Sequence, residues 1–338
     1  MILNRIKPIN LFNFWLSTSI LLVVIMVIVG GLTRLTDSGL SITEWEVFTG
    51  ILPPLNSEQW EIYFEKYKTI PQFYLLNTQM SLDEFKIIFY WEYFHRLLGR
   101  VIGVFFIVPL LYFSYKKTVN SRLTTNLYII FILICAQGVM GWYMVQSGLV
   151  SDTTVSHYRL SAHLLLAFTI ISFMFWIFLN TYNRTDKRFI KFKKETLFID
   201  FYLLIIISQI FLGALVSGLD AGRIYQTWPL MNQSFFPDDL QFNFFAIFDF
   251  DDHSAVQFLH RSSAYFILLY TLFIAYKISS HYRKYLQDFY IVVFLISIQV
   301  LLGIFTLTSG LNTYLASAHQ ITGLLLFFSV IYLRFKIT

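Results

Sequence analysis

Long apolar runs separated by short polar segments dominate the pattern of the chain. A helix that crosses a bilayer needs about 20 mainly apolar residues, and eight runs qualify by this measure. They lie at about 12–32, 91–113, 124–146, 160–180, 197–217, 257–277, 288–308 and 314–334. The pattern predicts an all-α membrane protein with eight transmembrane helices.

The charges of the loops predict how these helices are oriented. Cytoplasmic loops carry an excess of Lys and Arg, and placing the N-terminus inside puts the bases around Lys116, Arg188 and Lys284 in the cytoplasm. The long loops on the other side, at about 33–90 and 218–256, are poorer in bases. No convincing small-residue cleavage site follows the first run and no Arg-rich presequence is seen, so we expect a retained first helix. We predict a multi-pass protein of a bacterial inner membrane with both termini in the cytoplasm.

Composition agrees with a membrane location and narrows the classes of function. Of the 338 residues, 57% are hydrophobic and 13% are charged, whereas soluble domains average about 25% charged residues. The net charge of +5 is explained by the bases of the inner loops, so we expect contact with membrane lipid and no binding of nucleic acid. Cys135 is the single cysteine, which excludes an intramolecular disulfide and a thiolate metal cluster.

An internal repeat organises the eight spans. The first span ends in VGGLTRLTDSG and the fifth in LGALVSGLDAG, and the fourth and eighth share a Ser-Ala-His sequence. The third span, AQGVMGWYMVQSGL, matches the seventh, IQVLLGIFTLTSGL, which aligns Gln137 with Gln299 and Gly141 with Gly303. Each repeat holds an even number of spans, so both repeats face the same way in the membrane. We predict two pseudo-symmetric, fused four-helix bundles, at residues 1–183 and 184–338.

Four histidines occupy matching places in the two halves, namely His95, His163, His260 and His319. Each lies within one or two helical turns of the outer end of its span, and ionisable side chains inside a membrane are costly and therefore functional candidates. Cofactor sites in four-helix bundles are built by side chains on facing helices, and imidazole is a common axial ligand of haem iron. We predict that His95 with His163, and His260 with His319, each bracket one haem iron near the periplasmic side. Zinc or copper sites, or plain interface anchors, are the alternatives.

The halves differ three residues before the first histidine of each pair, where the first has Glu92 and the second has Gln257. The i,i+3 spacing places Glu92 on the same helix face as His95, where an acid suits proton transfer or the stabilisation of a developing cation. This asymmetry predicts that the first half carries out chemistry and the second holds a redox cofactor. The alternative is that Glu92 forms a structural ion pair with Arg96 or Arg100.

Arginines near the outer ends of the spans are candidates for binding haem propionates, because guanidinium groups bind carboxylates in a bidentate manner. These are Arg34, Arg96 and Arg100, with Arg159 as a fourth. Each taken alone is better explained by a contact with a helix end or a lipid headgroup. Their accumulation around the first histidine pair predicts at least one propionate contact.

Several motifs along nearly the whole chain resemble the haem A synthase family. They are GGLTRLTDSGLSITEW, LDEFKIIFYWEYFHRLLGR, AQGVMGWYMVQSGL, QTWPLMNQSFFP and the sequences around the four histidines. The resemblance is strongest to the subclass of alphaproteobacteria and mitochondria. It implies an oxidoreductase that oxidises the C8 methyl group of haem o to a formyl group. The family uses successive hydroxylations with water as the oxygen source, and the haem a product serves terminal oxidases.

The resemblance also implies roles for residues. By it, His95 and His163 hold the substrate haem o, His260 and His319 ligate the iron of a haem b cofactor, and Glu92 is the required acid. Some family members carry a cysteine pair in the first outer loop, and this sequence has none there, so we expect no thiol-based electron step.

The sequence leaves the partners and one other class of function open. We expect haem o as substrate, with a haem o synthase, an oxidase assembly factor and an unidentified electron acceptor as partners, and a homo-oligomer as an open alternative. A two-haem electron-transfer protein similar to a membrane cytochrome b is the second hypothesis, against which the difference between Glu92 and Gln257 argues. A transporter with parallel repeats is disfavoured, because its polar residues would lie near the bilayer midplane.

Overall fold

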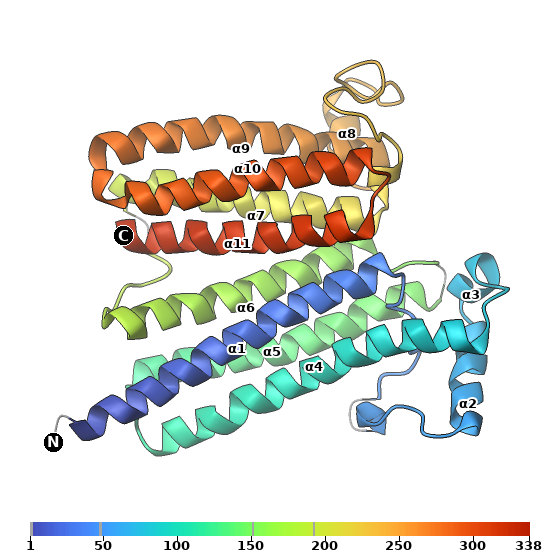
Figure 1. Cartoon of the computed structure of the whole chain (residues 1–338), viewed down its shortest axis with the longest axis horizontal. Coiled ribbons are helices and arrows are strands. Elements are labelled where there is room, and N and C mark those ends of the chain that lie inside the picture. Colours follow the sequence, from blue (N-terminus) through green and yellow to red (C-terminus); the bar gives the residue numbers. More distant parts are fainter. Residues whose placement is uncertain (1–2, 47–48, 151, 192) are drawn as a thin grey trace. The chain divides into compact units, whose positions relative to one another are not determined.

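The computed structural model describes residues 3–46, 49–150, 152–191 and 193–338, and these are built mainly from helices (Figure 1). Eight of the described helices are long and apolar enough to cross a membrane, which confirms the predicted all-α membrane protein. They are α1 (Leu3–Leu35), α4 (Leu82–Tyr115), α5 (Ser121–Gly148), α6 (His157–Asn183), α7 (Leu197–Gly218), α9 (His253–His281), α10 (Leu286–Thr308) and α11 (Thr313–Ile337).

The chain divides into two compact units, Met1–Arg184 and Thr185–Thr338, each with four of the long helices. In the first unit, α4 and α6 both pack against α1 and α5. In the second unit, α9 and α11 both pack against α7 and α10. The histidine-bearing helices of each unit therefore share both neighbours and lie across their bundle from each other.

The second spanning helix is longer than its apolar run predicts. The run begins near residue 91, but α4 begins at Leu82 because Ser81 and Glu84 form a capping box, in which each side chain bonds to the backbone N–H of the other residue. The additional turns pack against α2 (Ser57–Lys68), which is followed by α3 (Pro71–Leu76). The first long loop of the chain therefore has a folded part that rests on α4.

Aromatic side chains fasten this part of the loop to α4. Phe64 stacks on Phe85 with ring centroids 5.0 Å apart, and Trp60 meets Phe89 edge to face at 4.9 Å. Tyr67 is fully buried and donates a hydrogen bond from its hydroxyl to Gln72 Oε1 at 3.0 Å. Burying a large apolar side chain contributes about 1.5–3 kcal/mol. The loop is thus fixed firmly enough to hold neighbouring segments in place over α4.

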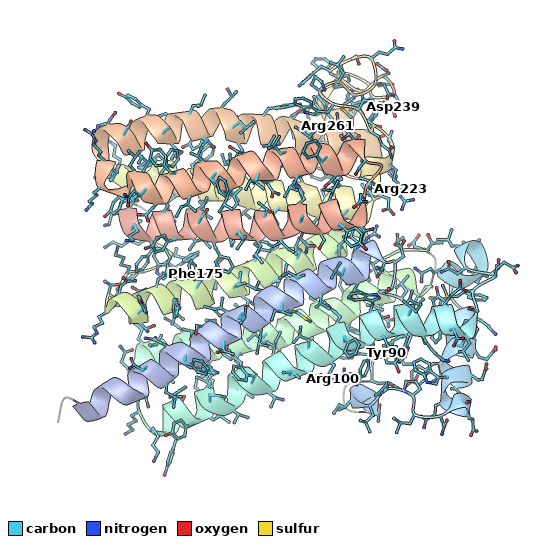
Figure 2. All side chains as sticks on the ribbon, viewed as in Figure 1. Tyr90, Arg100, Phe175, Arg223, Asp239 and Arg261 are labelled. Atoms are coloured by element: carbon cyan, nitrogen blue, oxygen red, sulfur yellow. The ribbon has the colours of Figure 1, made fainter. Side chains whose placement is uncertain are left out.

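Polar contacts hold the long loop of the second unit, which includes the short helix α8 (Phe244–Ile247). The hydroxyl of Tyr225 donates to Asp239 Oδ1 at 2.5 Å, and Ser254 Oγ donates to Asp239 Oδ2 at 2.8 Å. Burial, together with this acceptor, raises the pKa of Tyr225, so its hydroxyl stays protonated and remains a donor. Arg261 of α9 lies near the same loop (Figure 2) and donates to the carbonyl of Tyr225 at 2.9 Å.

Candidate haem-binding sites

Each histidine of the first unit lies against a glycine of a neighbouring helix. A Cβ atom added to Gly30 of α1 would lie 2.8 Å from Cε1 of His95 on α4. One added to Gly141 of α5 would lie 3.1 Å from Cε1 of His163 on α6. Any larger residue at these places would press on the imidazole, so both rings need the space that glycine leaves.

The second unit repeats this arrangement. A Cβ atom added to Gly213 of α7 would lie 3.2 Å from Cε1 of His260 on α9, and one added to Gly303 of α10 would lie 3.0 Å from Cε1 of His319 on α11. The repeat predicted from the sequence thus extends to the surroundings of the four rings. Each unit holds one histidine pair in the same kind of setting.

The glycine contact provides a matched test within α5. Replacing Gly141 with alanine should push the ring of His163 aside and weaken haem binding to the first unit on the order of tenfold, the effect expected when a metal ligand loses its orientation. Gly138→Ala is the control, because a Cβ atom there meets no atom within 4 Å. Titration of purified protein with haem, followed by absorption, measures both. Equal affinities for the two variants would show that the glycine is not needed.

Each unit brings two histidine rings into its helix bundle. All four histidines are partly exposed, although the Nδ1 atoms of His95 and His163 are buried. Each unit therefore offers two imidazoles from helices on opposite sides of its bundle, which fits the axial ligation of one haem.

The contacts of His319 show how one ring is held ready for iron. Its Nδ1 lies 3.1 Å from the carbonyl oxygen of Gln299, which can only accept a hydrogen bond, so the ring proton is on Nδ1. The lone pair is then on Nε2, where the side-chain amide of Gln299 donates to it at 3.2 Å. Iron would take the place of this weak donor. The donor set of the second unit therefore fits a haem cofactor held by His260 and His319.

A zinc site of the usual kind fits the structure less well than haem. Zinc sites usually take three or four protein ligands, and within the described ranges no group of three or more His, Cys, Asp or Glu side chains could hold a metal ion. A haem needs only two protein ligands because the porphyrin supplies the others. The histidine pairs meet that requirement.

Glu92 is buried and fully hydrogen-bonded. Its Oε2 accepts from Ser41 Oγ at 2.7 Å and from the backbone N–H of Ile42 at 2.8 Å. Its Oε1 accepts from Nε and Nη2 of Arg96 at 3.0 and 2.7 Å. The structure thus contains the ion pair with Arg96 that the sequence offered as an alternative. Among the described residues, the hydrogen bonds of Glu92 go to the first long loop and to Arg96, not to His95.

The ion pair anchors the loop that crosses α4. Arg96 also donates from Nη1 to the carbonyl of Glu44 at 2.8 Å and from Nη2 to that of Ile42 at 2.6 Å. In the second unit, Gln257 and Arg261 both donate to the carbonyl of Tyr225 at 2.9 Å. The residues before and after the first histidine of each pair therefore fix a loop, and only the first unit does so with a carboxylate.

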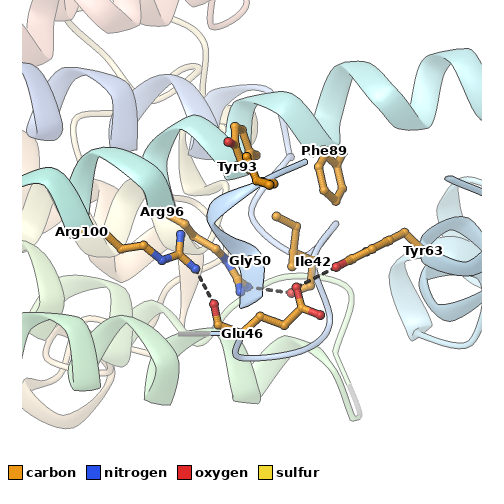
Figure 3. Close-up of a pocket in the computed structure, with 9 residues that line it drawn as sticks. Ile42, Glu46, Gly50, Tyr63, Phe89, Tyr93, Arg96 and Arg100 are labelled. Atoms are coloured by element: carbon orange, nitrogen blue, oxygen red, sulfur yellow. Dashed lines mark hydrogen bonds between the residues drawn. The ribbon is translucent and has the colours of Figure 1, made fainter. Parts of the chain in front are cut away.

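The arginines predicted to bind propionates already have partners within the protein. Arg34 pairs with Asp37 at 2.9 Å, and Arg96 is engaged as described. Arg100 donates to the carbonyl of Glu46. Arg96 and Arg100 nevertheless share one pocket (Figure 3), lined also by Ile42, Glu46, Gly50, Leu52, Tyr63, Phe89 and Tyr93. Their role toward a propionate stays a prediction.

Tyr63 sets the polarity of the far side of this pocket. Its hydroxyl donates to Glu46 Oε2 at 2.7 Å (Figure 3). Burial and the hydrogen bond to Glu46 raise the pKa of Tyr63, so the hydroxyl stays protonated. The side chain of Glu46 therefore accepts a hydrogen bond from Tyr63, while its backbone carbonyl accepts one from Arg100.

Some residues that contact the histidines or Glu92 can be found in the sequence as part of the repeat, and others cannot. The alignment of Gln137 and Gly141 with Gln299 and Gly303 is visible as a repeat. The contacts of these residues with histidines on the neighbouring helix can be seen only in the folded structure. Ser41 and the N–H of Ile42 carried no signal, because a loop contact more than forty residues away in the chain depends on the fold.

Comparisons with known proteins agree with this geometry. The family described as Cytochrome oxidase assembly protein matches residues 13–331. A protein of Pelagibacter ubique named Heme A synthase is 47% identical over 341 residues, covering 99% of both chains. Proteins of the same name from Rickettsia canadensis and Rickettsia felis are 39% and 38% identical, over 97% of this chain and 98% of theirs. The chain therefore belongs to the cytochrome oxidase assembly protein family, and its full-length relatives are haem A synthases.

Proposed function

We propose that this protein oxidises the C8 methyl group of haem o to a formyl group by successive hydroxylations with water as the oxygen source, giving haem a for terminal oxidases. His95 and His163 would hold haem o as the substrate, and His260 and His319 would hold haem b as a cofactor. The observation that carries this assignment is the pairing of two similar histidine sites with an acid, Glu92, in the first unit alone. The names of the relatives support it, and none of them favours an electron-transfer cytochrome.

The overall reaction determines how many protons and electrons must leave the substrate site. When a methyl group becomes a formyl group, two C–H bonds break and a C=O bond forms to an oxygen from water. This releases four protons and four electrons for each haem o. A bound haem b would supply a one-electron route toward an external one-electron acceptor, so a redox cofactor in the second unit accounts for the duplicated site.

Glu92 would act through its negative charge beside the substrate site. Removing electrons from the methyl group develops positive charge on the substrate, which a nearby carboxylate stabilises. Ser41 donates to this carboxylate at 2.7 Å and helps to hold it in place. Arg100 would bind a propionate, because its guanidinium donates to the carbonyl of Glu46 and lines the same pocket as Arg96.

The proposed setting follows from the charges of the loops. The protein would lie in the bacterial inner membrane with both termini in the cytoplasm and its haem sites toward the periplasmic side. A haem o synthase would deliver the substrate, and an assembly factor of the oxidase would receive the product. Both exchanges involve a hydrophobic haem, which favours transfer between proteins within the membrane.

Extraction and mass analysis of the bound haems tests the function. Protein purified from cells that make haem o should contain haem b together with haem a or hydroxylated haem o. His95→Ala should retain haem b and contain no haem a, because only the first unit is altered. Haem b alone in the wild-type protein, with haem o shown to be available, would instead indicate an electron-transfer cytochrome.

A further inference from the structure

One segment of the first long loop, the strap formed by residues 42–46, contacts both α4 and α5. On α4, the guanidinium groups of Arg96 and Arg100 donate to three backbone carbonyls of the strap. On α5, the ring of Trp142 stacks on that of Trp45, with centroids 5.3 Å apart and an interplanar angle of 27°. The strap therefore spans the edge of the bundle between these two neighbouring helices.

The strap is held firmly on one side. Each bond from a guanidinium group of α4 to a carbonyl is charge-assisted and stronger than a hydrogen bond between neutral groups. On α2, Tyr63 donates to Glu46 Oε2 at 2.7 Å (Figure 3), and Lys66 pairs with Glu44 Oε2 at 2.9 Å. The backbone of the strap is thus fixed to α4, and both of its carboxylates are fixed to α2.

The attachment of the strap to α5 is weaker. An aromatic pair contributes little beyond the apolar area that it buries, and this pair buries its area incompletely. Trp45 is 49% exposed and Trp142 is 37% exposed. Of the two attachments, the one to α5 is therefore the easier to break.

The stacked pair lies beside one of the proposed iron ligands. Trp142 follows Gly141, whose backbone lies against the ring of His163. At the other end of the strap, the backbone N–H of Ile42 donates to Glu92 Oε2 at 2.8 Å. The weak contact is thus next to the site, and the strap is tied to the proposed acid at its other end.

The second unit differs at this place. By the internal repeat, Trp228 matches Trp45, but Ile304 stands in the place of Trp142. The two units otherwise hold their histidines in the same kind of setting, each against a glycine. An aromatic pair at this place therefore distinguishes the first unit from the second.

We propose that the stack of Trp45 on Trp142 is a gate through which a hydrophobic haem enters and leaves the first unit from the membrane interface. The inference rests on the proposed function, in which haem o must reach the first histidine pair and haem a must leave it, whereas haem b stays in the second unit. Indole rings favour the boundary between water and lipid, so the open gate offers the haem an apolar way in beside His163. Closing the stack then separates the bound haem from the lipid and water outside.

Rates of haem exchange test the gate. Full-length protein that carries haem b takes up haem o in a stopped-flow experiment, an excess of apo-myoglobin then removes it, and mass analysis separates the two haems. Trp45→Ala should speed both uptake and release of haem o by about 2–10-fold, the factor that corresponds to the loss of an aromatic pair. The dissociation constant should stay the same, because a gate changes both rates by one factor.

Variants with the same change in size serve as controls. Trp45→Phe keeps an aromatic ring and should exchange haem o at nearly the wild-type rates. Trp228→Ala, at the matching place of the second unit, should change neither the exchange of haem o nor the retention of haem b. Trp45→Ala combined with Trp142→Ala should act no more strongly than either alone, because both remove the same contact. Trp45→Leu repeats the measurement if Trp45→Ala does not retain haem b.

Two results would overturn the inference. Unchanged rates in Trp45→Ala and Trp45→Leu would show that the pair only anchors the loop at the membrane interface. Faster release with an unchanged rate of uptake would make the pair a contact of the bound haem. Haem o that exchanges in the wild-type protein but is never oxidised would overturn the proposed function while the gate stands, and failure of the first unit to bind any haem would overturn both.

Discussion

Replacing Glu92 with glutamine should lower the formation of haem a by about 100-fold, within the range expected when an acid or base of an active site is lost. The amide can still accept from Ser41 and Ile42, but it leaves the guanidinium of Arg96 without a countercharge. A positive charge then faces a substrate that itself becomes positive during oxidation. The ratio of haem a to haem o in extracts of purified protein gives the result.

The two roles of Glu92, its negative charge and its anchoring of the loop, can be measured separately. Limited proteolysis of the first long loop should give the wild-type pattern for Glu92→Gln, because Gln257 shows that a glutamine at this position is compatible with a held loop. Glu92→Ala should lose both activity and protection, since breaking a buried ion pair costs about 3–5 kcal/mol. Full activity in Glu92→Gln would mean that the residue serves only to anchor the loop.

Replacing His319 with alanine should remove haem b from the purified protein and abolish haem a formation. A backbone carbonyl fixes the ring proton of His319 on Nδ1, so the loss of this ring removes a ligand that is held in place for iron. The pyridine haemochrome assay should show less than about a tenth of the wild-type haem b, since an affinity loss of 10–100-fold already follows from disturbing the outer partner alone.

Two further variants make this result specific to the second unit. His281→Ala, at the exposed end of α9, should keep haem b and activity. His319→Ala should also still bind haem o in the first unit, which optical titration after loading can follow. Retention of haem b at the wild-type level in both His319→Ala and His260→Ala would contradict the assignment of the cofactor site.

Much of the fold could be predicted because a membrane-spanning helix is recognised from the apolar composition of a single continuous stretch of sequence. The apolar runs gave all eight spans, and the error at α4 arose because a polar capping box at Ser81 and Glu84 extends the helix beyond its apolar part. The surroundings of His95 were harder to predict. The spacing of Glu92 placed it correctly on α4, but its partners Ser41 and Ile42 come from a loop whose path depends on long-range packing.

The sites were predictable to the extent that the repeat revealed them. A histidine that recurs with its neighbouring sequence can be recognised without a structure, and so can the replacement of Glu92 by Gln257. The contact between Gly30 and the ring of His95 could not be recognised in this way, because the sequence shows the glycine but not the helix that it faces. Only the packing of α1 against α4 places Gly30 beside the ring of His95.

The glycines behind the four rings have a consequence for how freely this protein can change. The wall behind each imidazole is main chain, whose shape is the same for any sequence that keeps the helix and the glycine. Leu, Ile, Val and Phe can therefore replace one another at lipid-facing positions over long evolutionary times without moving the imidazole ring that serves as metal ligand. Substitutions on the lipid-facing surface therefore leave the chemistry inside each bundle unchanged. A few fixed glycine positions are enough to preserve the placement of the histidine ligands.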